Sequence, residues 1–152
     1  MHLTQLLHGI ALLTDHGDLD CEISSLTCDS RQVGPGTLFF ALRGSKTDGH
    51  RYIPQAVAAG AAAVVLEDAV CAPNGLPWVQ VADGRIAMAQ IAAYFHGNPT
   101  QGRPLIGITG TNGKTTTSYL IEAILQAAGI PAAVLGTISY RFGATRIEAS
   151  HT

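Results

Sequence analysis

Apolar positions along the chain follow two spacings, which predict strands alternating with helices. Apolar runs at residues 37–42, 62–66 and 104–109 have the length of buried strands. Loops containing glycine or proline separate these runs from segments with helical spacing at residues 50–59 and 85–95. A strand, a helix and another strand in this order predict a β-α-β crossover, and therefore a sheet that is at least partly parallel.

The N-terminal apolar positions also have helical spacing, and they are Leu3, Leu6, Leu7, Ile10 and Leu13. We expect an amphipathic helix there, followed by a solvated polar loop over residues 15–20. Apolar and polar residues alternate over residues 22–28, which predicts a half-buried strand. The sequence Val-Gly-Pro-Gly at residues 33–36 predicts a turn, with Asp29 and Ser30 as capping residues before it. Residues 78–81 predict a further short strand.

Helical spacing also predicts which side chains of the two internal helices face the core. They are Ile53, Ala56, Val57 and Gly60 in the first helix, and Ile86, Met88, Ala89, Ala92 and Phe95 in the second. Asp48 is placed to cap the first of these helices.

The C-terminal third predicts a helix from residue 114 to about 128, a strand over residues 132–136 and a hairpin over residues 138–149. Gly129 is expected to end the helix in the left-handed conformation, and Pro131 prevents its continuation. Together with the strand at 104–109, these elements predict a second β-α-β unit. The apolar face of this last helix would lie uncovered, and the sheet has too few strands for a complete nucleotide-binding domain. We therefore expect a truncated domain.

Helix breakers over residues 96–103 predict a domain boundary. We expect a mixed α/β domain over residues 1–97, a linker over 98–103 and the start of a second, Rossmann-like domain over 104–152. The predicted fold class is α/β.

Composition excludes several classes of partner. The 152 residues are 47% hydrophobic and 13% charged, and the net charge is −2, so no basic surface is available for nucleic acid or an anionic membrane. No apolar stretch reaches the roughly 18 residues of a membrane span, and the N-terminal residues lack the features of a signal peptide. Cys21, Cys28 and Cys71 lack metal-binding spacing, and as reduced, mostly buried thiols they fit a cytoplasmic protein.

Residues 104–117, PLIGITGTNGKTTT, have the order apolar run, glycine turn, helix start that is typical of a phosphate-binding loop. Gly110 and Gly113 would let backbone amides approach phosphate oxygens. Lys114 would reach the β- and γ-phosphates, and the Thr115 hydroxyl would bind Mg²⁺. The general pattern G-x-x-x-x-G-K-[ST] is missed by one position, because Ile108 stands where its first glycine belongs.

A family resemblance explains this departure. The segments Phe-Phe-Ala-Leu-Arg-Gly at 39–44, Asp-Gly-His at 48–50 and Asp-Ser-Arg at 29–31 resemble the N-terminal domain of the Mur ligases. The segment Thr-Gly-Thr-Asn-Gly-Lys-Thr-Thr at 109–116 resembles the ATP loop of that family. The resemblance implies ATP contacts from Gly110, Thr111, Asn112, Gly113, Lys114, Thr115 and Thr116.

The loop, combined with Leu-Gly-Thr-Ile at 135–138, resembles the third ligase of the series more than its neighbours. The resemblance implies transfer of the ATP γ-phosphate to the carboxylate of a UDP-N-acetylmuramoyl dipeptide, followed by attack of the amine of meso-diaminopimelate or L-lysine on the acyl phosphate. It also implies ATP and Mg²⁺ as cofactors, a cytoplasmic monomer at full length, and further catalytic parts beyond residue 152. On this basis the fragment is expected to be inactive alone.

The resemblance also implies a UDP-sugar site, formed by Cys28, Ser30, Ser45, Lys46, Thr47, His151 and Thr152, with Cys28 contributing its backbone. Three alternatives to the third-step ligase stay open at this point: a ligase that adds D-alanyl-D-alanine, a UDP-sugar- or nucleotide-binding module without catalysis, and an unrelated phosphate-loop hydrolase.

Overall fold

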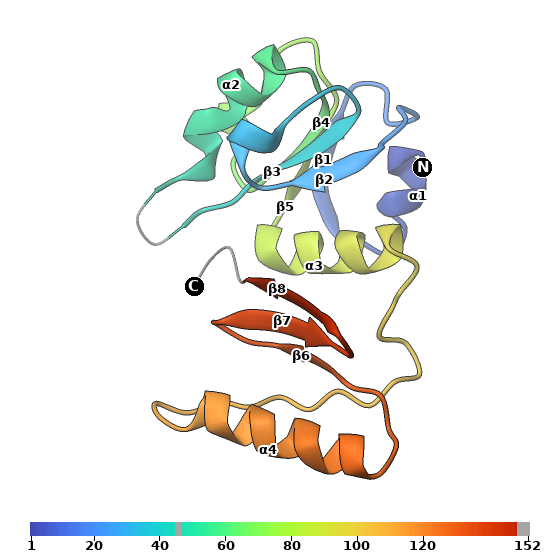
Figure 1. Cartoon of the computed structure of the whole chain (residues 1–152). Coiled ribbons are helices and arrows are strands. Elements are labelled where there is room, and N and C mark those ends of the chain that lie inside the picture. The colour runs from blue at the N-terminus through green and yellow to red at the C-terminus, as the bar shows by residue number, and fades with distance from the viewer. Residues whose placement is uncertain (45–46, 149–152) are drawn as a thin grey trace. The chain divides into compact units, whose positions relative to one another are not determined.

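The computed structural model describes residues 1–44 and 47–148, and it divides into two compact units, Met1–Gln101 and Gly102–Thr152 (Figure 1). Ser45, Lys46, His151 and Thr152 lie outside the described residues. Each unit is described by itself below, and the domain limits given above stay a prediction.

The first unit is built on a five-stranded sheet in the order β1-β5-β4-β3-β2. The strands are β1 (Leu12–His16), β2 (Ser25–Thr27), β3 (Thr37–Ala41), β4 (Ala61–Leu66) and β5 (Trp78–Val81). Strands β2 to β5 are parallel to their neighbours, and β1 pairs antiparallel with β5 at the edge. The predicted β-α-β crossover between β3 and β4 is therefore confirmed, as is the mixed α/β fold class.

Helices cover both faces of this sheet and define two apolar cores (Figure 1). On one face, α1 (Leu3–Leu6) and α3 (Gly84–Phe95) pack over Leu38 and Phe40 of β3. On the other face, α2 (Ile53–Ala58) packs over Phe39 and Ala41 of the same strand. All five residues of β3 are buried, since successive side chains of a strand enter opposite cores.

The N-terminal helix is much shorter than predicted. It ends at Leu6, and Gly9 adopts a left-handed φ of 80° before the chain enters β1. Leu13, expected on the buried helix face, is 62% exposed, and the expected loop at 15–20 begins inside a strand. Residues 12–16 form a strand because they pair with the open edge of β5, which supplies backbone hydrogen bonds. The spacing of apolar residues along the sequence contains no information about this pairing.

The expected half-buried strand at 22–28 is reduced to β2, and residues 30–32 form a short 3₁₀ helix, η1 (Ser30–Gln32). The first internal helix also begins as a 3₁₀ helix, η2 (Gly49–Tyr52), before α2. Ile53 and Ala56 are buried as predicted, whereas Gly60 is exposed, with a left-handed φ of 94°. A third 3₁₀ helix, η3 (Ala69–Cys71), follows β4.

The predicted core face of α3 was wrong in part. The fully buried residues of this helix are Gly84, Ala87 and Ile91, whereas Ile86 is 58% exposed and Ala89 is also exposed. The helix is fixed at its start by the Asp83 carboxylate, which accepts hydrogen bonds from the backbone amides of Arg85 and Ile86. The buried face is the one that places Ala87 and Ile91 in the core beside Leu38 and Phe40.

The cysteines were expected to be mostly buried, and this was wrong. Cys28 and Cys71 are exposed, and only Cys21 is partly buried. Burial raises the pKa of the Cys21 thiol, with smaller contributions from Asp18 and Asp20.

The second unit contains α4 (Lys114–Ala127) and a three-stranded antiparallel sheet of β6 (Ala133–Leu135), β7 (Ser139–Phe142) and β8 (Thr145–Glu148). The hairpin is confirmed, with Gly143 at a φ of 56° in its turn. The end of α4 is also confirmed: Gly129 has a φ of 72°, and the Ile130 amide donates to the Leu125 carbonyl oxygen at 2.8 Å.

Residues 104–109 form no strand, and β6 pairs with β7 rather than with this segment. The predicted second β-α-β unit is therefore wrong. A parallel strand needs hydrogen-bonding neighbours on its edges, and within the described part of this unit none pairs with residues 104–109. The helix α4 has no fully buried residue, as expected for an uncovered face.

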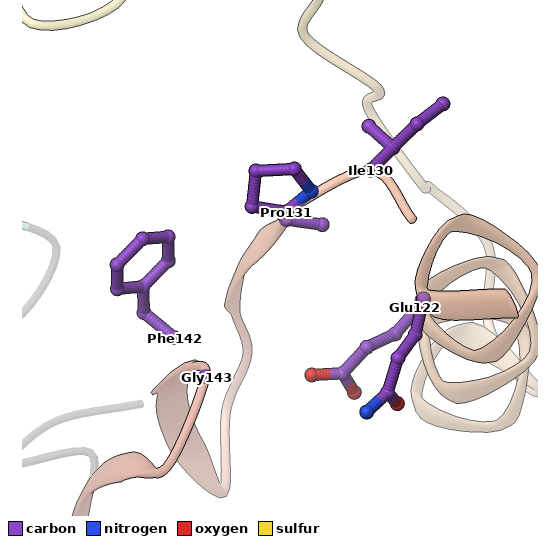
Figure 2. Close-up of a pocket in the computed structure, with 7 residues that line it drawn as sticks. Glu122, Ile130, Pro131, Phe142 and Gly143 are labelled. Atoms are coloured by element: carbon purple, nitrogen blue, oxygen red, sulfur yellow. The ribbon is translucent and has the colours of Figure 1, made fainter. Parts of the chain in front are cut away.

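One ion pair joins α4 to the sheet of this unit. Arg141 on β7 donates to the Glu122 carboxylate at 2.7 Å and lies 3.9 Å from the centre of the Tyr119 ring. A pocket of about 140 Å³ in this unit is lined by residues that include Glu122, Pro131 and Phe142, which Figure 2 shows as sticks. The Glu122 carboxylate raises the pKa of Arg141.

Candidate functional site

The carboxyl ends of four parallel strands place the polar loops of the first unit along one edge of the sheet. Residue 28 follows β2, residues 42–48 follow β3, residues 67–68 follow β4 and residues 82–83 follow β5. Ligands of parallel α/β sheets bind at this edge, because the loops converge there and point away from the core. Two of the predicted UDP-binding segments, at 28–30 and 45–47, therefore follow neighbouring strands.

A surface pocket of about 480 Å³ lies at the end of β2. It is lined by Cys28, Asp29, Ser30, Arg31, Tyr52 and Gln55. The Ser30 hydroxyl donates to the Gln55 side-chain oxygen at 3.0 Å and so ties η1 to α2. The structure thus brings the predicted residues Cys28 and Ser30 into one pocket.

The Asp-Ser-Arg segment is held by its own carboxylate. Asp29 accepts a hydrogen bond from the Arg31 amide at 3.0 Å, so the predicted capping role is confirmed for Asp29, although the capped element is the 3₁₀ helix η1. The Arg31 guanidinium also donates to both Asp29 oxygens, at 2.9 and 2.6 Å, and this pairing raises the pKa of Arg31. The Arg31 guanidinium therefore lies at the pocket as one half of an ion pair with Asp29.

Four lining residues of this pocket were not predicted as UDP contacts: Asp29 and Arg31, which flank Ser30, and Tyr52 and Gln55. Tyr52 is 40% exposed although it is aromatic, and Gln55 is polar at the start of α2. An aromatic and an amide side chain beginning a helix directly after a polar loop were the signal available, because aromatic faces and amides are suited to a planar base.

The loop after β3 is closed at its base by an antiparallel bridge between Arg43 and Asp48. The Gly44 amide donates to the Thr47 carbonyl oxygen at 2.9 Å, and the Gly49 amide donates to the Leu42 carbonyl oxygen at 2.8 Å. Thr47 is exposed at this edge. The predicted residues Ser45 and Lys46 lie between these anchors and outside the described residues.

Asp48 leads this loop into η2. Its carboxylate accepts hydrogen bonds from the His50 amide at 3.0 Å and from the His50 ring at 2.6 Å, and together these lower the pKa of Asp48. The predicted capping role of Asp48 is confirmed, although the capped element is a 3₁₀ helix.

This lowered pKa makes the first unit sensitive to acid. The folded state binds the Asp48 proton less tightly than the unfolded state, so the stabilisation is complete above the ordinary aspartate pKa of about 3.9 and is lost as pH falls through the lower folded value. We expect Asp48→Asn to destabilise the unit at pH 7 and to have a smaller effect at pH 2.5. Urea unfolding of both chains at the two pH values measures this. A destabilisation of equal size at both pH values would contradict it.

The predicted phosphate loop lies in the second unit. Gly110 and Gly113 have positive φ values of 141° and 78°, which side-chain-bearing residues rarely adopt. Gly113 is the N-cap of α4, and no acidic residue lies in the first turn of this helix. Lys114 donates to the Gly110 carbonyl oxygen, so its ammonium group lies against the loop.

The remaining predicted loop residues, Thr111, Asn112, Thr115 and Thr116, are all exposed. Four amides at the N-terminus of an α-helix lack intrahelical partners, and the helix dipole places positive charge there. Backbone amides, an ammonium group and threonine hydroxyls at one helix start can bind a polyphosphate with its cation. His151 and Thr152, predicted at a further contact, lie outside the described residues.

Across residues 1–44 and 47–148, no three His, Cys, Asp or Glu side chains gather in a way that could hold a metal ion. The helices in the same ranges are all too short or too polar to cross a membrane.

Comparison with known families identifies both units. The model described as "Mur ligase family, catalytic domain" matches residues 22–96, and the model described as "Mur ligase middle domain" matches residues 108–152. The chain belongs to the Mur ligase family.

Within this family, the chain is similar to enzymes that share one name. The chain is 57% identical over 152 residues to a UDP-N-acetylmuramoyl-L-alanyl-D-glutamate--2,6-diaminopimelate ligase of Geobacter sulfurreducens, and 61% identical over the same length to the ligase of that name in Geobacter metallireducens. Both matches cover 100% of this chain and 30% of the relative. The chain therefore spans less than a third of the length of these proteins.

Solved structures agree with this family. A structure of a UDP-N-acetylmuramoyl-L-alanyl-D-glutamate--2,6-diaminopimelate ligase matches 95% of this chain and 29% of its own, with a TM-score of 0.74 and 26% identity. MurF from Acinetobacter baumannii matches 83% of this chain and 27% of its own, with a TM-score of 0.65 and 29% identity.

Proposed function

We propose that the chain is the N-terminal part of an ATP-dependent ligase that adds meso-diaminopimelate to UDP-N-acetylmuramoyl-L-alanyl-D-glutamate in peptidoglycan synthesis. The observation that carries this proposal is the identity of 57% and 61% over all 152 residues to two enzymes named for this reaction. The proposal includes a cytoplasmic enzyme that is a monomer at full length. The residues that select diaminopimelate or L-lysine are expected beyond residue 152.

In this proposal, the pocket at the end of β2 holds the uridine and diphosphate part of the substrate. Cys28 contributes backbone groups, Ser30 contributes its hydroxyl, and Ser45, Lys46 and Thr47 are proposed as the second UDP-binding segment. The exposed ring of Tyr52 supports this proposal, because it lines the same pocket and suits a planar base. His151 and Thr152 are proposed to contact the muramoyl peptide.

ATP is proposed to bind at Gly110 to Thr116. The backbone amides at Gly113 and the start of α4 would bind phosphate oxygens, and Lys114 would neutralise the charge of the γ-phosphoryl group as it migrates. The exposed Thr115 hydroxyl is a hard oxygen donor and fits Mg²⁺, which would supply further neutralisation of phosphate charge when bound. Both effects help because phosphoryl transfer depends on positioning and charge neutralisation.

The proposed reaction has two steps. The glutamate carboxylate of the nucleotide substrate attacks the γ-phosphate of ATP, which gives an acyl phosphate and ADP. The amine of the amino acid then attacks the acyl carbon, and an amide forms as phosphate leaves. The addition of D-alanyl-D-alanine is the second candidate, since MurF structures resemble the chain as well.

A ligation assay on the full-length enzyme that contains these residues tests the reaction. With ATP, Mg²⁺ and the UDP-linked dipeptide, we expect amide formation with meso-diaminopimelate. Mass spectrometry of the product identifies the added group. Ligation of D-alanyl-D-alanine to the UDP-linked tripeptide, without any reaction of the dipeptide, would replace the proposal by the second candidate.

A blocking substitution tests the UDP pocket in the chain itself. Cys28→Trp places a large ring where the pocket opens, and we expect the affinity for UDP to fall about tenfold or more, a free-energy change of about 1.4 kcal/mol or above. Calorimetric titration with UDP measures the change. Cys71→Trp is the matched control, because Cys71 is an exposed cysteine outside the pocket. Equal weakening by both substitutions would contradict the placement of the site.

A further inference from the structure

Ser30 and Gln55 form a polar pair on the wall of the pocket at the end of β2. Both line this pocket of about 480 Å³, together with Cys28 and Tyr52 among others. The Ser30 hydroxyl lies 3.0 Å from the side-chain oxygen Oε1 of Gln55 and donates its proton to it. Ser30 belongs to η1 and Gln55 belongs to α2, so the pair forms only where these two elements meet.

This hydrogen bond decides what the Ser30 hydroxyl offers to a ligand. A serine hydroxyl has one proton to donate and two lone pairs that accept. The single proton of Ser30 is donated to Gln55, so the Ser30 oxygen has only its lone pairs left for a group in the pocket. With Gln55 as its partner, Ser30 is therefore an acceptor for the ligand and does not donate to it.

The two pyrimidine bases differ at the atom that such an acceptor would read. Uracil carries a proton on N3, between its two carbonyl oxygens, and can donate it. The N3 atom of cytosine carries no proton and accepts, and the neighbouring O4 is replaced by an amino group. Uracil can therefore donate from N3 to the Ser30 oxygen, whereas cytosine would place one acceptor against another. A desolvated polar group without a partner lowers affinity.

A bound base would strengthen the pairing of Ser30 with Gln55. Ser30 is partly buried and Gln55 is exposed, so water competes for their hydrogen bond in the open pocket. The ring of Tyr52 is 40% exposed and lines the same pocket, where it suits one face of a planar base. A base held there displaces water, and a hydrogen bond is stronger where the local dielectric is low.

We propose that Gln55 is a positioning residue that gives the pocket its preference for uracil: it takes the proton of Ser30, and the Ser30 oxygen then selects uracil over cytosine in a nucleoside diphosphate. This role rests on the proposed function of the pocket as a UDP site and adds its base specificity. Gln55 acts through the Ser30 hydroxyl. Rotation of the Gln55 amide by 180° would turn its nitrogen to Ser30 and reverse the preference, so the base preference tests the orientation directly.

Titration calorimetry with UDP and with CDP measures the preference as the ratio of the two dissociation constants. We expect the unaltered chain to bind UDP about tenfold more tightly than CDP. Gln55→Met removes the acceptor and frees the Ser30 proton for N3 of cytosine, so the ratio should fall to about one. Gln55→Glu still accepts the Ser30 proton, so the ratio should stay within about threefold of the original. Gln90→Met, at an exposed glutamine of α3 outside the pocket, is the matched control and should keep the ratio.

A role of Gln55 in packing alone would weaken binding of UDP and CDP equally in Gln55→Met, and an unchanged ratio in that variant would overturn the positioning role. UDP binding without a preference over CDP, or with the reverse preference, would overturn it too, while the proposed UDP pocket would stand. Failure of the unaltered chain to bind either nucleotide counts against the pocket and the positioning role together. Ser30→Ala, checked for folding by thermal unfolding, should also bring the ratio to about one, because the acceptor itself is lost. A preference that survives in folded Ser30→Ala would place base selection elsewhere.

Discussion

Lys114→Ala in the full-length enzyme is expected to reduce ATP-dependent ligation at least about a hundredfold, the scale on which removing one preorganised electrostatic contact to a transition state acts. The ammonium group of Lys114 lies against the loop at Gly110, at the start of α4, where a γ-phosphate would bind. Alanine removes the only charge that the loop segment 110–116 carries. Phosphate release and amide formation, measured together, give the change.

Two control measurements test whether the loss of ligation is specific to the charge of Lys114. Arg146→Ala removes a positive charge from an exposed position on β8 and is expected to leave the ligation rate unchanged. UDP affinity of the Lys114→Ala chain should also be unchanged, because the pocket at Cys28 and Ser30 belongs to the other unit. Ligation at a near-normal rate in Lys114→Ala would remove Lys114 from the proposed mechanism.

Phe40→Ala is expected to destabilise the first unit by about 3–5 kcal/mol, the range measured when a buried phenylalanine is truncated. Phe40 is 1% exposed and lies in the core between the sheet and the helices α1 and α3. Removing its ring deletes apolar burial and leaves a cavity that close-packed neighbours fill only in part. Such a loss is a large part of the stability of a domain of this size.

Urea unfolding, with far-ultraviolet circular dichroism as the signal, measures this change. Tyr94→Ala is the matched control, because it also truncates an aromatic ring but at a position on α3 that is 44% exposed. We expect the control to cost less than about 1 kcal/mol. Similar losses in both variants would contradict the assignment of Phe40 to the core.

The first unit shows most clearly how much of the fold could be predicted from local sequence patterns. The run at residues 37–42 predicted β3, and the spacing of Ile53 and Ala56 predicted the buried face of α2, because both features follow from side-chain periodicity alone. The prediction for the N-terminal segment was wrong because it also rested on side-chain periodicity alone. Leu3, Leu6, Leu7, Ile10 and Leu13 fit a helix, but the open edge of β5 takes residues 12–16 as a strand.

The candidate sites also contain some features that the sequence predicted and others that depend on tertiary contacts. Glycines and a lysine at fixed spacing are sufficient to predict a phosphate loop, since each residue type is required by the chemistry of the backbone or of the charge. Gln55 could not be predicted as the partner of Ser30, because the approach of these two side chains depends on the angle between η1 and α2. The contact between the His50 ring and the Glu67 amide could not be predicted either, since Glu67 is distant in sequence and the two residues meet only through the pairing of β3 with β4.

The sequence by itself therefore determined the chemistry of the phosphate loop, the parallel sheet of the first unit and the family resemblance, all of which depend on residue type and short spacing. Only the tertiary structure decided that residues 12–16 form a strand and that Ile86 faces solvent. It also decided which side chains meet at the carboxyl edge, where Ser30 meets Gln55 and His50 meets Glu67. Backbone pairing at sheet edges and contacts between distant loops are set by the packing of the whole unit, and no local pattern contains them.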